Sequence, residues 1–160
     1  MINTAKTLKT FFGGFGIPAY TLQSVPDTVA LPYITYPLIE PEWSEQASFY
    51  AQVWYPKNKL SALLAKADQI AAAIGATGIK FEQPGGYLLI YPTTPLIQII
   101  TDESTQSAYI NLVINAYQMP GYNPPAATPE PTQVTPGEAA NEPDGEGENH
   151  TPGESPEEGV

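Results

Sequence analysis

The sequence predicts an α+β protein: a two-layer sandwich in which a long helix and a short N-terminal helix pack on a mostly antiparallel sheet of four or five strands. Three observations support this class. Residues 58–74 have an uninterrupted helical period, and residues 107–118 alternate between apolar and polar side chains. The later strand-like segments are separated by short connections, which favour antiparallel pairing.

The N-terminal segment predicts a short amphipathic helix. Its apolar residues recur at helical spacing, and Gly13 and Gly14 end the pattern. Lys6 and Lys9 fall on the polar side. The apolar positions are Ile2, Ala5, Leu8, Phe11 and Phe12.

Two strands are expected next, over residues 33–39 and 47–55. The first lies in "ALPYITYPLIEPEW", where Pro32, Pro37 and Pro41 interrupt a strand-like composition. Proline cannot donate to a β-ladder, so we expect this strand at a sheet edge that faces a partner. In the second strand one side carries Phe49, Ala51, Val53 and Tyr55, and the other carries Tyr50, Gln52 and Trp54.

The clearest helix follows. Asn58 is the expected N-cap, and Gly75 or Gly78 is expected to end the helix. The predicted apolar stripe consists of Leu60, Leu63, Leu64, Ala67, Ile70, Ala71 and Ile74.

Strands are then predicted over residues 78–83, 87–92, 96–102 and 107–118. Pro84, Gly85 and Gly86 indicate a hairpin turn rather than a phosphate-binding loop, because a strand follows them. The residues "TTP" at 93–95 indicate a second turn. In the last strand one face is predicted to carry Ala108, Ile110, Leu112, Ile114 and Ala116, and the other Tyr109, Asn111, Val113, Asn115 and Tyr117.

The composition changes after residue 121. Residues 122–160 are rich in Pro, Gly and Glu, hold nine of the 17 acidic residues and contain no lysine. Low apolar content with charge of one sign predicts a disordered acidic tail behind a folded domain of residues 1–121. The net charge of −11 therefore belongs mostly to the tail, since the body has eight acids against six lysines.

Several functional classes are disfavoured. The chain has no Arg, and its lysines form no block, so sequence-specific nucleic-acid binding is not expected. Cysteine is absent and the one histidine, His150, lies in the predicted tail, so neither a metal nor a cofactor is expected. Prolines and polar residues interrupt the apolar interval 83–101, and no export signal is visible, so we expect a soluble protein without a membrane span.

Acidic residues leave one enzymatic alternative open. Glu40, Glu42 and Glu45 are close in sequence, as are Asp102 and Glu103. A small hydrolase would need two such carboxyls in one pocket, whereas both groups are more typical of solvated loops. A ligand-binding or surface-recognition module carrying an acidic stalk is a further alternative.

Aromatic residues are the more informative feature. Tyrosines on strands often line a core with their hydroxyls outward, but Tyr and Trp are also enriched at protein–protein contacts. Because the sequence offers no catalytic set and no basic patch, we expect contact surfaces around the loop of Trp43 and the connector of Tyr20. The candidate interface residues are Tyr20, Tyr33, Tyr36, Glu40, Glu42, Trp43 and Trp54.

The order of landmarks resembles a known family. A short helix precedes "GIPAY" and "VPDTVALPYITY", and a strand ending in "VWYPKN" leads into "LSALLAKADQIAAAIG". The paired strands "YLLIYPTTPLIQIITD" and "AYINLVINAYQMPG" follow. Over residues 1–121 this pattern resembles the tail terminator (tail-completion, minor tail or minor capsid) proteins of long-tailed bacteriophages.

The resemblance implies a non-enzymatic virion protein, assembled in the host cytoplasm and located in the tail or neck. Its subunits would form a ring with copies of themselves, typically a hexamer, on the end of the tail tube. The ring would stop polymerisation of the tube protein and provide a surface for head-docking and connector proteins. A head–tail connector or stopper of the same region is the nearest alternative.

Overall fold

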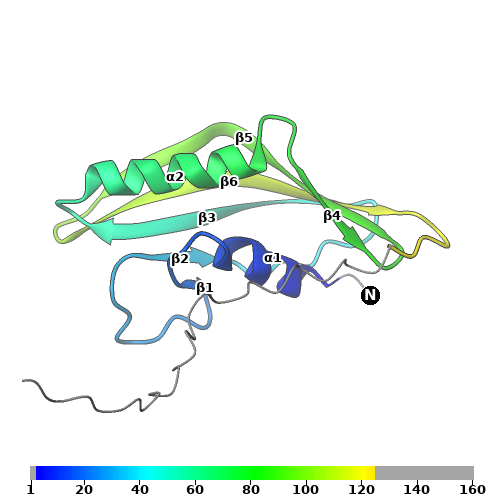
Figure 1. Cartoon of the computed structure of the whole chain (residues 1–160), viewed down its shortest axis with the longest axis horizontal. Helices are drawn as coiled ribbons and strands as arrows, with labels where there is room; N and C mark the ends of the chain where they lie inside the picture. Colours follow the sequence, from blue (N-terminus) through cyan, green and yellow to red (C-terminus); the bar gives the residue numbers. More distant parts are fainter. Residues whose placement is uncertain (1–2, 125–160) are drawn as a thin grey trace, which may run out of the picture. The chain divides into compact units, whose positions relative to one another are not determined.

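The computed structural model describes residues 3–124. These residues form one six-stranded sheet and two helices (Figure 1). The predicted acidic tail from residue 125 onward, with His150, lies outside the described residues. The elements are α1 (Thr4–Gly13), β1 (Ala19–Thr21), β2 (Tyr33–Tyr36), β3 (Gln46–Pro56), α2 (Leu60–Ile74), β4 (Ile79–Gln83), β5 (Gly86–Thr101) and β6 (Thr105–Gln118).

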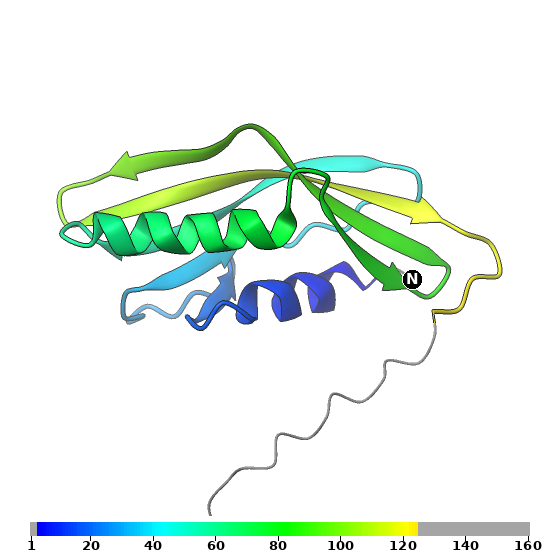
Figure 2. The ribbon, with the colours of Figure 1, turned by 45° about the horizontal axis from the view of Figure 1, so that its top comes forward.

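The α+β class is confirmed, but the sheet has more strands than predicted. Its order is β1-β2-β3-β6-β5-β4, and every neighbouring pair is antiparallel except β1 and β2. Helix α2 contacts β3, β6 and β5, whereas α1 lies near β1 and β2 and also contacts β4, where Phe11 packs on Phe81 and Gln83 donates to Thr7 (Figure 2). The strand that was not predicted from the sequence is β1, whose residues 19–21 pair in parallel with β2.

Prolines limit β2 without making it an edge strand. Pro32 and Pro37 flank the four residues of β2, which pairs with β3 on one side and with β1 on the other. The expectation that this strand forms an edge facing a partner was therefore wrong. Proline excludes ladder bonds only at its own position, and none of the four residues between these two is a proline.

Strand β5 is continuous where two strands and a turn were predicted. Its register against β6 shifts between Pro92 and Ile97, so residues 93–95 form an irregularity inside the strand. Strand β4 pairs only with residues 86–90 of β5, so the prolines interrupt no ladder on that side. Asn111 Nδ2 donates to the Pro95 carbonyl at 2.8 Å and ties the irregularity to β6.

The helices differ from prediction mainly at the start of α2. Helix α1 is capped by the Asn3 side chain, which accepts from the Lys6 backbone N–H. The N-cap of α2 is Lys59, with no side-chain capping bond, so the assignment of Asn58 was wrong. Gly75 ends α2 as predicted, with φ of 71°.

The core lies between the sheet and the helices. The buried faces predicted for β3 and β6 are confirmed, since both sets of apolar residues are buried. Leu8 and Phe12 of α1 are fully buried, and the Phe12 ring stacks on Tyr36 of β2 at 4.9 Å. In α2 the buried residues are Leu63, Ala67, Ile70 and Ile74; the predicted stripe was too wide, because Leu60 and Leu64 are 47% and 39% exposed.

The end of the described chain is attached to the β4–β5 hairpin. The Gly85 N–H donates to the Tyr122 carbonyl, and the Met119 N–H donates to the Gly85 carbonyl. The Tyr122 hydroxyl also donates to Glu82. Assigning Tyr122 to the tail was therefore wrong, because its backbone and side chain both bond to the body.

Gly86 has no room for a side chain. A Cβ built there would lie 1.9 Å from the Tyr117 carbonyl oxygen and 2.8 Å from the Trp43 ring, and its φ is 158°. We expect Gly86→Ala to lower the free energy of unfolding by about 2–3 kcal/mol, measured by urea denaturation. The control is Gly13→Ala, where nothing lies within 4 Å. Equal stability of the two variants would contradict this packing of β5 on β6.

Candidate interaction surface

The face of the sheet that points away from the helices carries most of the exposed aromatic rings. Strand side chains alternate, so neighbours of buried core residues point to the opposite face. The ladder registers place opposite one another Tyr33 and Trp54, Gln52 and Tyr109, and Tyr87 and Tyr117. We call this surface the aromatic face; its aromatic members are Tyr20, Tyr33, Tyr50, Trp54, Tyr87, Tyr91, Tyr109 and Tyr117.

The rings of the aromatic face contact one another across strands. Tyr20 packs edge-on against Tyr33 at 6.2 Å, and Tyr33 stacks on Trp54 at 6.0 Å. Separate pairs form between β3 and β6 and between β5 and β6, with centroid distances of 4.9 Å for Tyr50–Tyr109 and 4.8 Å for Tyr87–Tyr117. Such contacts fix ring orientation before any partner binds.

Buried polar groups lie beneath this ring layer. Gln52 Nε2 donates to Ser107 Oγ at 2.9 Å, although no helix covers this side, and both residues are buried. Trp54 Nε1 donates to Thr35 Oγ1 at 3.0 Å. Some of the aromatic area therefore shields satisfied polar pairs, and exposed parts of the same rings remain available for contact. Tyr50 and Tyr117 are the most exposed, at 39% and 38%.

Charge is nearly absent from the sheet. Lys80 and Glu82 are the only charged residues within the six strands, and both belong to β4. A surface of this kind does not attract phosphate groups, which basic residues neutralise in nucleic-acid complexes. Its composition instead matches the desolvated centre of a protein–protein interface, where charges are depleted and Tyr and Trp are enriched.

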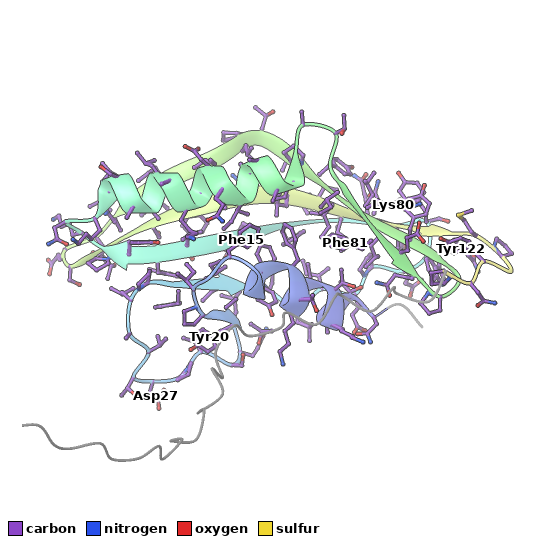
Figure 3. The ribbon with its side chains drawn as sticks, in the orientation of Figure 1. Phe15, Tyr20, Asp27, Lys80, Phe81 and Tyr122 are labelled. Atoms are coloured by element: carbon purple, nitrogen blue, oxygen red, sulfur yellow. The ribbon has the colours of Figure 1, made fainter. Side chains whose placement is uncertain are left out.

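The charged corner formed by β4 is closed by local bonds. Lys80 Nζ lies 3.0 Å from Glu82 Oε1 and 4.8 Å from the centre of the Tyr87 ring. Figure 3 shows Lys80 and Tyr122 at the same end of the sheet. The hydrogen bond from Tyr122, and then that from Lys80, lowers the pKa of Glu82, whereas bonding to Glu82 raises the pKa of Tyr122.

The predicted interface residues divide into three groups. Tyr20, Tyr33 and Trp54 lie together on the aromatic face, and Figure 3 shows Tyr20 at β1, the outermost strand on that side of the sheet. Tyr36 is 2% exposed and packs on Phe12, so its assignment to an interface was wrong: it points to the helix side.

The remaining predicted residues lie on the connection between β2 and β3. Glu40 and Glu42 are exposed there, and Trp43 is half-buried against the core and the β4–β5 turn. The interface residues predicted from the sequence did not include five tyrosines of the aromatic face: Tyr50, Tyr87, Tyr91, Tyr109 and Tyr117. The alternation of residues 47–55 and 107–118 predicts that Tyr50, Tyr109 and Tyr117 point away from the core. This alternation was the sequence signal from which the aromatic face could have been found.

Carboxylates do not gather around a pocket in the part of the chain that is described. Glu40, Glu42, Glu45, Asp102 and Glu103 are all exposed. Glu45 lines a small hollow of about 130 Å³ with Ser44, Gln46, Asn115 and Tyr117, where it is the only acid. Residues 3–124 contain no cluster of three His, Asp or Glu residues that could hold a metal ion.

Comparisons of the chain with protein-family models, with curated proteins and with solved structures give no match. Over residues 3–124, neither helix has the length and apolarity that a membrane span requires.

The Glu82 corner generates a prediction about pH. Replacing Tyr122 with Phe removes the main donor to Glu82, so the pKa of Glu82 should rise toward its ordinary value, as NMR titration of the carboxyl carbon would measure. Because the pKa of Glu82 is lowered in the folded state, its ionised carboxylate stabilises the fold at pH values above the pKa of the unfolded chain. This stabilisation is lost as the pH falls through the pKa of the folded state. Tyr117→Phe, at a hydroxyl that bonds to Asn115, is the control and should leave Glu82 unchanged.

Proposed function

We propose that this chain is a structural virion-assembly protein: a tail terminator that forms a ring, caps the phage tail tube and provides the surface on which the head docks. The observation that carries the proposal is the aromatic face. A sheet face that is uncovered, nearly uncharged and rich in fixed Tyr and Trp rings has the composition of an interface centre.

The residues that carry the resemblance fall on the elements that build this face. The "PYITY" motif contains β2, and "WYPKN" joins the end of β3 to α2. The segments "YLLIYPTTPLIQIIT" and "AYINLVINAYQ" lie in β5 and β6, which form the middle of the sheet together with β3. The pattern therefore covers the sheet centre and its principal helix.

The charge distribution also agrees with a place along a DNA channel. The strands contain one cation, Lys80, and that ammonium is paired with Glu82. A wall without free cations offers no phosphate contacts that would hold passing DNA.

A head–tail connector or stopper is the second candidate within the same assembly, and the aromatic face suits it equally. Binding partners separate the two: a terminator binds ends of the tail tube, whereas a connector binds the portal or its adaptor. The hydrolase alternative receives no support from the described residues, because the carboxylates proposed for it are exposed and lie on connections.

The proposal is tested by measuring the mass of the assembled oligomer and its binding to phage tail tubes. Size-exclusion chromatography with light scattering, together with native mass spectrometry, should give a closed oligomer, a hexamer in the expected case. Negative-stain images should show rings at the ends of purified tail tubes. A monomer at every concentration that does not bind tubes would contradict the proposal.

A variant on the aromatic face tests whether that surface is covered on assembly. Tyr50→Glu places a charge at a 39% exposed position, and desolvating that charge should weaken ring formation or tube binding at least about tenfold. Ala72→Glu, at an exposed position of α2 on the helix side of the sheet, is the control. Equal assembly by both variants, with unchanged melting temperatures, would show that the face is not buried in the complex.

A further inference from the structure

The two outermost strands of the sheet are protected against pairing with another chain, but two inner strands are not. Strand β1 has three residues, and β4 carries Lys80 and Glu82; short length and charge both discourage edge pairing. By contrast, β2 pairs only with residues 52–54 of β3, and β4 pairs only with residues 86–90 of β5. Residues 46–51 and 91–101 therefore have β6 on one side and no strand on the other.

We define the β5 ledge as residues 96–101, which follow the irregularity and have the sequence LIQIIT. The ledge has no charge. Ile99 lies opposite Ala108, on the helix side, and Ile100 lies opposite Ser107, on the aromatic face. They are 39% and 51% exposed, so aliphatic surface is open on both faces. An uncharged apolar edge of this kind either aggregates or is covered by a specific strand.

The adjacent flank of α2 extends this apolar surface into the helix layer. Leu60 and Leu64 are exposed and lie four residues apart on one side of the helix. Lys66 lies on the other side, where its Nζ donates to the Phe15 carbonyl after α1 at 2.7 Å. Leu60 and Leu64 therefore lie on the flank of α2 opposite the one that faces the end of α1, and α2 itself contacts β5. An exposed apolar helix flank thus accompanies the uncharged edge of β5.

We define the β3 ledge as residues 46–51, with the sequence QASFYA. It also has six residues and no charge. On the helix side it carries Phe49 between two small residues, Ala47 and Ala51, whereas the β5 ledge carries Ile97 and Ile99 there. Among the described residues, no backbone hydrogen bond joins the connection 37–43 to this ledge. That connection presents Leu38, 49% exposed, as apolar surface.

We infer that the β5 ledge of one copy adds as a strand to the β3 ledge of a second copy, so that the sheet continues between subunits. The chain itself is the occupant because both edges are uncharged, each offers six consecutive strand residues, and the two strands run in the same direction. Pairing two β5 ledges about a two-fold axis would leave the β3 ledge uncovered and would stop at two copies.

Strand directions agree with a ring. Strands β3 and β5 both run antiparallel to β6, so they run in the same direction. Copies related by rotation about an axis along the strands keep that direction, and the two ledges would pair in parallel. The inference rests on the proposed function in one respect: it assumes that repetition of this contact closes into a ring.

The two ledges sit at different levels along β6. The β3 ledge lies opposite residues 110–115 of β6, whereas the paired part of the β5 ledge lies opposite residues 106–110. If one copy is shifted along the strand direction by about five residues relative to the next, its β5 ledge lies beside the neighbour's β3 ledge. The same shift moves the β5 ledge beyond the end of the neighbour's β2. Closed sheets require such a stagger, because their strands tilt relative to the axis.

The absence of cysteine allows a direct cross-linking test. Ser48 and Gln98 are exposed, lie on the two ledges and point to the aromatic face. We expect a mixture of Ser48→Cys and Gln98→Cys full-length chains to give a covalent heterodimer under mild oxidation or with a short bismaleimide. Each single variant alone should stay uncross-linked.

Other outcomes would overturn the inference. Cross-linking of Gln98→Cys with itself would indicate two-fold pairing of β5 ledges, and an oligomer without a 48–98 cross-link would place the contact elsewhere. Ser24→Cys, on an exposed loop after β1, mixed with Gln98→Cys controls for random collision. Ile99→Lys should weaken oligomerisation at least tenfold, whereas Leu22→Lys should leave the oligomer unchanged.

The same experiments separate this inference from the proposed function. A ring that binds tail tubes but lacks the 48–98 cross-link would retain the terminator function and reject the ledge contact. A 48–98 cross-link in an oligomer that never binds tubes would retain the contact and reject the terminator.

Discussion

The pairing of β3 with β6 is the constraint on which the rest of the structure depends. Eleven consecutive residue pairs join the two strands, from Gln46 opposite Asn115 to Pro56 opposite Thr105. Over this length the side-chain period of two assigns each residue to one of two faces. A slip of β6 by one residue would exchange Ile110 and Ile114 with Asn111 and Asn115, and would place amides against the helices.

This ladder creates two unlike layers. On one side, fully buried aliphatic residues receive α1 and α2 and provide the hydrophobic free energy of folding. On the other side, tyrosines and a tryptophan pack on one another above satisfied amide and hydroxyl pairs. The second layer is ordered by the same strands without being covered by the chain, so it combines rigidity with exposure. Rigid aromatic groups lose little conformational entropy on binding.

Unequal strand lengths give the sheet its free borders. Strands β3, β5 and β6 are long, whereas β2 and β4 are short, so each short strand leaves part of its long neighbour unpaired. Prolines produce much of this inequality. Pro32 and Pro37 bound β2, and Pro92 and Pro95 fall in the part of β5 that β4 does not reach. The free borders thus follow in part from where ladder donors are missing.

The amino-acid sequence by itself determined the features that depend on local periodicity. These are the two helices, the buried faces of β3 and β6, the hairpin at residues 84–86 and the scarcity of charge in the strands. The tertiary structure decided what depends on distant neighbours: β1 beside β2, the continuity of β5, the burial of Tyr36 on Phe12, and the attachment of Tyr122 to Glu82 and Gly85. The physical reason is that period and turn chemistry act over a few residues, whereas partners separated by tens of residues are chosen by packing of the whole sheet.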